Sequence, residues 1–553
     1  MTAVGRSSPR ADAETKVRGE AKYGVDFEAA GTLHAALTLS PVPAGRILGI
    51  DTSQAAAMPG VRGVFTAADA PDICSGLAVN DQPLFASDVV RFEGEAIAAV
   101  VAETLAQARA AADAVRVDIE ATEAIATVGR ALAEGAPLVH QDWHTYTVRA
   151  GLPDFPRAGN VCGEMTVDPG GVDEAFAGAD VVVEDEFWID RQYQAYLEPK
   201  SATGIYEDGR YTIHVAHQQP WNVRDRSAAA LGVRASDVRV VGHHIGGGFG
   251  AKLDTGLEPY AALLARLVGA PVKMVHDRTA DILTCASREG AVIRMRSGVT
   301  RDGRIVAREF LCDMDAGAYA GDTPFLTSIP IFVVGSLYRV GPTRIVSRSV
   351  YTNTAPTGAF RGVSGTYLYF ALERHTDNLA NAVGMDRREF RIRNLMTDGH
   401  VMLNGQALDD AGILATAFDR AEQHSPWREM GKGPNRGVGM AAAVWLTNPM
   451  AGEVSLQLHT DGRLGVVTGA TENGSGAVAM GVRQIAAEEL GIAADEVVLT
   501  MPDTDAQGFD AGSQGSRTTH IVGRAVRNAA VGMRERILKV AAQMTGQGPD
   551  ELE

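Results

Sequence analysis

The chain has 553 residues and a formal net charge of −17 at neutral pH, and 45% of its residues are hydrophobic and 22% charged. One hydrophobic core does not grow to this size, so we expect several packed domains and no long disordered block. The negative charge, with no local cluster of lysine and arginine, argues against a nucleic-acid partner because phosphate backbones would be repelled.

Neither the first residues nor the apolar runs suggest a destination outside the cytoplasm. Residues 1–16 contain no apolar signal core and no twin-arginine pair. The run 96–102, rich in alanine and valine, ends at Glu103, far short of the roughly 20 residues that cross a bilayer. We therefore predict a cytoplasmic protein.

The four cysteines form no CxxC pair and lie far apart. That spacing argues against an iron-sulfur cluster, a zinc knuckle or a disulfide framework. Each is expected to be a small buried residue: Cys74, Cys162, Cys285 and Cys312.

In chain order, the pattern predicts three units of α+β class. Residues 12–128 mix short strands with a helix near 106–115, whose alanines favour that structure, and so predict a small α/β domain. Residues 129–170 contain several prolines and are predicted to be a linker. A second unit, 171–425, has strand-like segments at 181–189 and 211–220, a strand that runs into a glycine-rich turn within 238–252, and a helix near 257–268. A third, 426–553, has a hairpin turned at Asp461–Gly462 and a helix at 480–490.

The glycine turn 246–250 follows a strand and precedes a helix, so it imitates a dinucleotide-binding turn. Asp277 would be the acidic partner, although it lies farther beyond the turn than the usual roughly 20 residues. A phosphate-binding P-loop is excluded because Lys252 is followed by Leu253 rather than by serine or threonine. In either case, glycines let backbone N–H groups approach an anion closely.

Other pairs of potential ligands have simpler interpretations. His140 and His144 have metal-like spacing, but the segment is not convincingly helical and offers no third ligand. His243 and His244 are consecutive on a strand and should point to opposite faces. Asp503 and Asp505 lie in a loop, where aspartates commonly cap turns.

Several segments, in order, resemble the large molybdopterin subunit of the xanthine oxidase and aldehyde oxidoreductase family. The sequences KVRGEAKYGVDF, MPGVRGVF and VVRFEGEAIAAVVAET resemble its N-terminal hammerhead-like domain. The sequences AHQQPWNVRD, HIGGGFGAK, GAFRGVSG and FRIRNL resemble its first molybdopterin-binding domain, and TGATENGSG and GSQGSRTTH its second. The resemblance covers almost the whole chain.

The resemblance assigns site residues one by one. Gln218 matches a catalytic glutamine close to the molybdenum oxo group, and no side chain is expected to ligate the metal, which the pterin dithiolene holds. Ser475 stands where the family usually has glutamine, so that contact is altered. The residues expected to bind the cofactor are Gln218, Gly248, Phe249, Gly250, Arg361, Ser475, Gly515, Ser516 and Thr518.

The resemblance also implies a reaction and partners. An aldehyde or N-heterocycle would be hydroxylated with oxygen from water at Mo-molybdopterin, in its plain or cytosine dinucleotide form. The chain has no cysteine set for a cluster and no convincing flavin site, so 2Fe–2S and FAD are expected on partner subunits. Leu253 stands where purine hydroxylases carry a substrate-binding glutamate, and Val363 replaces the ring-stacking phenylalanine common in the family's AFRGFG segment. Both changes predict an aliphatic substrate pocket.

The family places its catalytic glutamate near the end of a longer chain, and no such segment precedes Glu553. We therefore expect the second molybdopterin-binding domain to be incomplete, with its remaining segment and the base missing here or supplied by another chain. A noncatalytic cofactor-binding or scaffold protein is the alternative, and a dinucleotide-dependent dehydrogenase is a third.

Overall fold

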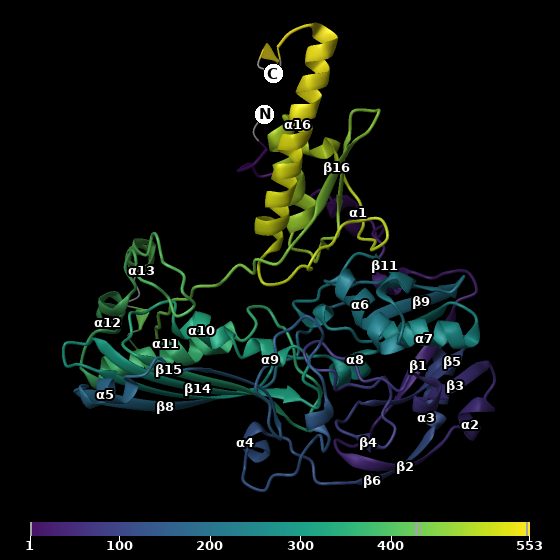
Figure 1. Ribbon diagram of the computed structural model, residues 1–553, viewed down its shortest axis with the longest axis horizontal. Coiled ribbons are helices and arrows are strands. Elements are labelled where there is room, and N and C mark those ends of the chain that lie inside the picture. Colours follow the sequence, from purple (N-terminus) through teal and green to yellow (C-terminus); the bar gives the residue numbers. More distant parts are fainter. Residues whose placement is uncertain (1–2, 426–429, 432, 549–550, 553) are drawn as a thin grey trace.

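The computed structural model describes residues 3–425, 430–431, 433–548 and 551–552. These residues form a wide body that contains two large sheets, with a third unit standing on it (Figure 1). Helices and mixed sheets alternate along the chain, which confirms the predicted α+β class. The predicted start of the third unit, residue 426, lies outside the described residues.

The largest sheet is built from two separate stretches of the chain. β1 pairs in parallel with β12, Leu33 lying opposite Val272, so backbone hydrogen bonds join the first predicted domain to the second. The interior strand β5 is buried along its whole length, which fits its uninterrupted apolar sequence. The sheet order is β11 (Val238–Gly242), β10 (Arg210–Val215), β9 (Ser201–Glu207), β12 (Val272–Val275), β1 (Leu33–Leu39), β5 (Ala96–Ala102) and β3 (Val61–Thr66).

Three helices cover this sheet. The predicted first helix is present as α3 (Leu105–Ala114), and its N-terminus is capped by the side chain of Thr104. α6 (Pro220–Leu231) and α7 (Glu258–Val268) both end at a glycine in the left-handed conformation. Helix α7 packs directly on β9, at Gly204, so the strand and the helix approach closely.

A second, five-stranded sheet forms the other half of the body. The predicted linker 129–170 is not wholly irregular, because its residues 161–167 form an edge strand of this sheet that pairs with β15. Its prolines all lie outside that strand, which explains how both features coexist. The sheet order is β7 (Val161–Val167), β15 (Thr343–Tyr351), β14 (Ile305–Gly317), β13 (Ala291–Val299) and β8 (Val181–Ile189).

The long helix α11 (Gly365–Ala382) packs on β8 and β13 of this sheet. It begins immediately after the loop 358–364, which contains Arg361. The buried carboxyl of Glu289 accepts hydrogen bonds from Ser364 Oγ and from Tyr367 OH, and burial raises its pKa. These bonds fix the first turn of α11, and with it the end of the loop.

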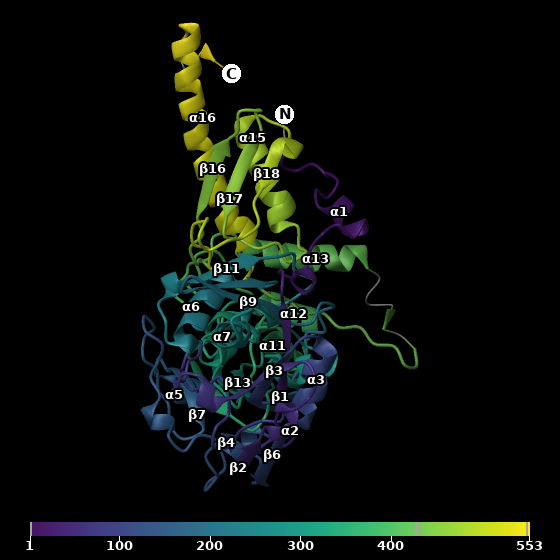
Figure 2. The same cartoon turned by 90° about the vertical axis from the view of Figure 1, so that its right-hand side faces the viewer.

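The third unit is a small sheet with two helices. The predicted hairpin is present as β16 (Val454–Leu458) and β17 (Leu464–Thr468), and β18 (Val497–Leu499) joins it in parallel. The predicted helix 480–490 begins as a π-helical turn, η6 (Ala477–Val482), and continues as α15 (Arg483–Leu490). A second π-helical turn, η8 (Thr518–Val522), precedes α16 (Gly523–Thr545), which ends at Gly546 and extends well beyond the sheet (Figure 2).

The remaining elements are short, except for α13. The remaining helices and strands are β2 (Gly45–Asp51), β4 (Val89–Val90), β6 (Arg116–Ala121), α1 (Ala13–Val17), α2 (Ser53–Ala56), α4 (Val128–Ala131), α5 (Val172–Ala177), α8 (Arg278–Thr284), α9 (Thr323–Leu326), α10 (Ile329–Val334), α12 (Arg387–Asn394) and α13 (Gly412–His424). Within the described residues, no helix is long and apolar enough to cross a membrane.

The close packing of α7 on β9 is open to test at Gly204. A Cβ atom there would lie 2.3 Å from the carbonyl oxygen of Ala261, so Gly204→Ala must displace the helix backbone. We expect a loss of about 1–3 kcal/mol of stability, measured as a lower urea midpoint. Gly49→Ala is the matched control in strand β2, where no atom lies within 4 Å of the added Cβ. Equal stability of the two variants would contradict this account of the packing.

Candidate functional site

The glycine-rich turn after β11 depends on backbone conformations that favour glycine. Gly247 and Gly250 have φ values of +88° and +116°, and the non-glycine Phe249 has φ +55°. A Cβ at Gly250 would lie 2.3 Å from the carbonyl oxygen of Ala359, so the turn lies directly against the loop 358–364. The Arg361 amide donates to the Phe249 carbonyl at 2.7 Å and closes this contact.

A buried ion pair holds the turn from behind. Glu198 accepts hydrogen bonds from the Gly246 amide and from Lys252 Nζ, each at 2.7 Å. Glu198 and Lys252 are both buried, and burial lowers the pKa of the Lys252 ammonium although Glu198 acts to raise it. The pair thus anchors both ends of the turn to the chain that precedes β9.

Gln218 connects this turn to the third unit. Its Oε1 accepts a hydrogen bond from the Gly250 amide at 3.0 Å, and its Nε2 donates to the Ser513 carbonyl at 2.8 Å. Its main-chain carbonyl accepts from the Ser513 amide at 2.9 Å. Gly248 packs against this side chain, because a Cβ there would lie 2.5 Å from Oε1. The buried Gln218 therefore bonds to both glycine-rich segments.

A neighbouring histidine supports Gln218. Burial lowers the pKa of His217 to about 3, so its imidazole is neutral at neutral pH. Its Nδ1 accepts from the Gln219 amide at 2.9 Å, which leaves the hydrogen on Nε2 to donate to the Asp254 carbonyl at 3.3 Å. The Gln219 side chain in turn donates to the Ala511 carbonyl at 2.8 Å.

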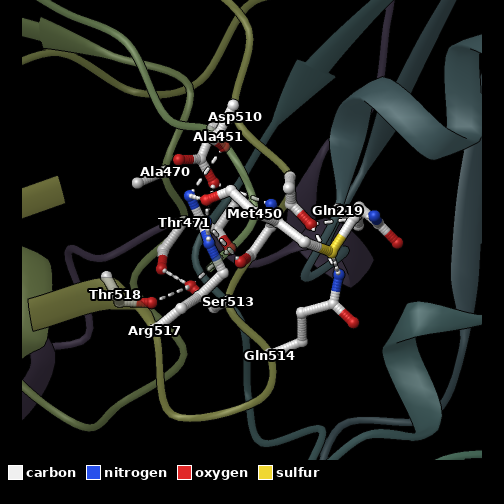
Figure 3. Close-up of polar contacts among 12 residues, drawn as sticks. Gln219, Met450, Ala451, Ala470, Thr471, Asp510, Ser513, Gln514, Arg517 and Thr518 are labelled. Atoms are coloured by element: carbon white, nitrogen blue, oxygen red, sulfur yellow. Dashed lines mark hydrogen bonds and ion pairs between the residues drawn. The ribbon is translucent and has the colours of Figure 1, made fainter. Parts of the chain in front are cut away.

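The loop 510–518 of the third unit is organised by a buried ion pair (Figure 3). Arg517 Nη1 lies 2.9 Å from Asp510 Oδ1, and both side chains are fully buried. The guanidinium also donates to the carbonyls of Gly512 at 2.9 Å and Ala451 at 2.7 Å, while the Gly512 amide donates to Asp510 Oδ1 at 2.7 Å. Sequence reasoning missed this pair, because it does not distinguish a buried arginine in a polar loop from an exposed one.

Three hydroxyl groups complete this loop. Thr471 Oγ1 donates to the main-chain carbonyl of Gln218 at 3.0 Å, and it also lies 3.2 Å from Ser513 Oγ. Thr518 Oγ1 lies 3.4 Å from the same serine oxygen, at the start of η8 (Figure 3). Gly515 and Ser516 between them have φ values of +51° and +58°. Consecutive left-handed residues of this kind turn successive N–H groups in one direction.

These two turns contain backbone donors without acceptors. Among the described residues, nothing accepts a hydrogen bond from the amides of Gly248, Phe249, Gly515 or Ser516. The exposed guanidinium of Arg361 likewise has no partner in this part of the chain, although its main chain is bonded on both sides. Free N–H groups from two units and a free cation form a donor set suited to an anionic ligand.

The remaining predicted residues lie around these turns. Leu253 is half-buried in the short helix η5 (Ala251–Leu253), directly after the glycine turn. Val363 has φ +45°, unusual for a β-branched residue, and its side chain packs partly on the core of the five-stranded sheet. Ser475 is exposed, and its Oγ accepts from the Ala477 amide at 3.3 Å; no contact joins it to Gln218.

The other sequence patterns have structural roles. His140 is buried and contacts Tyr146 OH at 3.0 Å, and no group of three or more metal-ligating side chains occurs among the described residues. Asp277 caps α8 by accepting from the Ala280 amide at 2.8 Å, and α7 begins only at Glu258, well after the glycine turn. The dinucleotide hypothesis therefore loses both its acidic partner and its helix N-terminus. Asp503 pairs with Arg239 across the two units.

Comparison with known proteins identifies the family. Residues 18–123 match the a/b hammerhead domain of aldehyde oxidase and xanthine dehydrogenase, and residues 155–395 and 414–553 match two molybdopterin cofactor-binding domains. The chain is 31% identical over 565 residues to a putative xanthine dehydrogenase molybdenum-binding subunit of Escherichia coli, covering 97% of this chain and 73% of that protein. The chain belongs to the xanthine oxidase family of molybdenum-binding large subunits. The resemblance seen in the sequence is thereby confirmed.

Solved structures of this family share the fold. An aldehyde oxidoreductase from Desulfovibrio gigas superposes with a TM-score of 0.88 at 28% identity, over 96% of this chain and 60% of that one. A nicotinate dehydrogenase large molybdopterin subunit of Eubacterium barkeri is 32% identical over 423 residues, covering 76% of this chain and 96% of that protein.

The buried ion pair of Asp510 and Arg517 in the loop 510–518 can be tested by substitution. Asp510→Asn leaves the buried guanidinium of Arg517 without a counter-charge, which typically costs about 3–5 kcal/mol. We expect hydrogen exchange at the amides of 448–453 and 510–518 to quicken accordingly. Arg527→Ala is the matched control, because its ion pair with Glu489 is largely exposed and worth under about 1 kcal/mol. Similar exchange in both variants would show that the pair does not organise the loop.

Proposed function

We propose that the chain binds Mo-molybdopterin between its two glycine-rich turns and hydroxylates an aldehyde or an N-heterocycle with oxygen from water. The family and the cofactor-binding domains support the cofactor itself. The observation that carries the proposal is that Gln218 bonds to Gly250 on one side and to Ser513 on the other. Both turns are thereby presented to one ligand.

The donor set of the site fits this cofactor. Molybdopterin carries a phosphate and a dithiolene, both anionic, and the free amides of Gly248, Phe249, Gly515 and Ser516 are donors without acceptors. Arg361 adds a cation that no described residue neutralises. We assign these five residues, with Gly250 and Thr518, to holding the cofactor. Ser475, exposed and on the neighbouring loop, is assigned a weaker contact at the rim.

When bound, the cofactor supplies a metal centre that accepts two electrons from the substrate. The protein's part is to orient groups around it. Gln218 uses one Nε2 hydrogen on Ser513 and its Oε1 on Gly250, so its second Nε2 hydrogen would be the one free to donate to the bound cofactor. Because two fixed bonds hold the amide, this donor is preorganised and needs no rearrangement.

Electrons released in the reaction need a route out of this chain. No pair of its cysteines is linked or suited to hold a cluster: Cys162, Cys285 and Cys312 are buried and separate, and Cys74 is exposed. We propose separate iron-sulfur and FAD subunits as the acceptors. Relatives that are named as subunits of larger enzymes agree with such an assembly.

Cofactor content tests the proposal. Protein co-produced with its partner subunits should contain about one molybdenum and one pterin per chain. Arg361→Ala should lower that content severalfold, because a charge-assisted hydrogen bond to an anion is lost. Arg301→Ala, 90% exposed at the far end of β13, should leave it unchanged. NAD in place of molybdenum in the unaltered protein would overturn the proposal, and full occupancy of Arg361→Ala would remove Arg361 from the site.

The pocket wall predicts substrate preference. Leu253 and Val363 offer only aliphatic side chains, so the polar edge of a purine would be buried without hydrogen-bond partners. Each such group costs on the order of 1–3 kcal/mol, or about 5- to 150-fold in kcat/KM. We therefore expect the complete complex to oxidise xanthine poorly compared with aromatic aldehydes or N-heterocycles.

Leu253→Glu provides the matched test of this pocket. A carboxylate at that position restores a partner for a polar ring edge, so activity with xanthine should rise relative to activity with an aldehyde. A clear preference of the unaltered complex for xanthine, or no change in the ratio with Leu253→Glu, would refute the assignment of this wall.

A further inference from the structure

Residues 3–25, called the strap below, run from the third unit to the body of the molecule. At the start of the strap, the amide of Val4 donates to the Glu488 carboxylate at 3.2 Å. Gln484 Nε2 donates to the carbonyls of Ala3 and Arg6 at 3.2 and 3.1 Å. Both partner side chains belong to α15, and Ala3 packs on the core of the third unit. Figure 2 shows this segment beside α15.

Midway along the strap, Arg10 reaches the loop 472–476. Its Nη1 donates to the Gly474 carbonyl at 2.8 Å, and its Nη2 lies 3.4 Å from Glu472 Oε1. Asp12 orients the guanidinium by accepting from Nη2 at 3.0 Å. The Arg10 side chain is 32% exposed and that of Glu472 only 12%, so solvent screens this contact only in part.

The Glu472 carboxylate is the centre of that loop. Its Oε1 accepts from the amides of Gly474 and Gly476 at 2.7 and 2.9 Å. Its Oε2 accepts from the amides of Val478 and Ala479 at 3.2 and 3.0 Å, in the first turn of η6. One carboxylate thus fixes the backbone of the loop 472–476 and the first turn of η6. Arg10 is the cationic partner of this carboxylate and also bonds to the Gly474 carbonyl.

The other end of the strap contacts the first glycine turn. The His244 amide, two residues before that turn, donates to the Lys22 carbonyl at 3.2 Å. The Val25 amide donates to Glu198 Oε1 at 3.3 Å, and the same carboxylate holds Gly246 and Lys252 through Oε2. The strap therefore touches the support of the first glycine turn in one unit and the loop 472–476 in another.

We propose that the strap ties the loop 472–476 of the third unit to the support of the first glycine turn, and that Arg10 is a positioning residue for that loop that acts through Glu472. The proposal rests on the proposed function in one respect only, namely that a positioned loop should retain the cofactor more tightly. The bonds of the strap join atoms of this chain only, so the strap is testable on the full chain alone. No other described residue forms an ion pair with Glu472.

The first test is hydrogen exchange on the full chain without cofactor. Arg10→Ala should quicken exchange at the amides of Gly474, Gly476, Val478 and Ala479 by roughly three- to tenfold, as for a partly exposed ionic contact. Exchange at the amides of β17 should not change. A general loss of stability of the third unit would instead quicken exchange in β17 as well. Arg10→Lys keeps the positive charge but loses the several N–H donors of the guanidinium, so exchange at the same four amides should be intermediate.

The matched control is Arg18→Ala, on the same strap, whose ion pair with Glu14 is exposed. Exchange at the four loop amides of Arg18→Ala should equal that of the unaltered chain. Unchanged exchange at the four amides in Arg10→Ala, or equal acceleration across β17, would overturn the positioning role. If one arginine variant fails to fold, the comparison of Arg10→Lys with Arg18→Ala decides the same question.

The second test uses the complete complex after cofactor loading. Molybdenum retained after dialysis should fall severalfold faster in Arg10→Ala than in Arg18→Ala. Absence of molybdenum from the unaltered complex would count against the proposed function and leave the exchange result standing. Equal retention in both variants, with altered exchange, would confine Arg10 to the shape of the loop and contradict its role in holding the cofactor.

Discussion

The side chain of Gln218 sets the arrangement on which the site depends. It is buried between two units of the fold, and its amide is bonded to a backbone amide on one side and to a backbone carbonyl on the other. A buried amide left without partners would cost about 1–3 kcal/mol, so the two turns cannot separate without exposing or orphaning it. The distance between the walls is therefore governed by the length of one glutamine. Thr471 reinforces this by donating to the Gln218 main chain.

Each wall has its own buried ion pair behind it. Glu198 and Lys252 lie behind the first turn, and Asp510 and Arg517 behind the second. Ion pairs removed from water stabilise little in net terms, since desolvation offsets their attraction, but either partner alone would be strongly unfavourable. Their geometric value is larger, because both also hold backbone amides or carbonyls of the turn. In both walls the charged groups are buried, and some N–H groups of the turn are left without an acceptor among the described residues.

Local signals in the sequence were sufficient for the elements that make the turns. The strand β11, the glycine turn, helix α7 and the hairpin at Asp461–Gly462 all follow from periodicity and turn residues within about 30 positions. The contacts that assemble the site are not local. The parallel pairing of Leu33 with Val272 and the bond from Gln218 to Ser513 join residues hundreds of positions apart, which periodicity does not encode. The resemblance to a family supplied Gln218, whereas the buried Arg517 had no distinguishing pattern.

Three strained backbone positions lie in the segments that form the site. Phe249, Val363 and Ser516 all have positive φ values without being glycine, and each lies in one of the segments that bound the site. Such conformations cost of order 1–3 kcal/mol each and persist only where surrounding contacts hold them. The contacts are present: Arg361 N–H on the Phe249 carbonyl, the Glu289 carboxyl below Ser364, and Arg517 next to Ser516. At Phe249 the strained turn leaves the amide without an acceptor among the described residues and the residue 44% exposed. A relaxed extended residue at that position would direct the amide elsewhere, so the positive φ of Phe249 sets the direction of this unpaired donor.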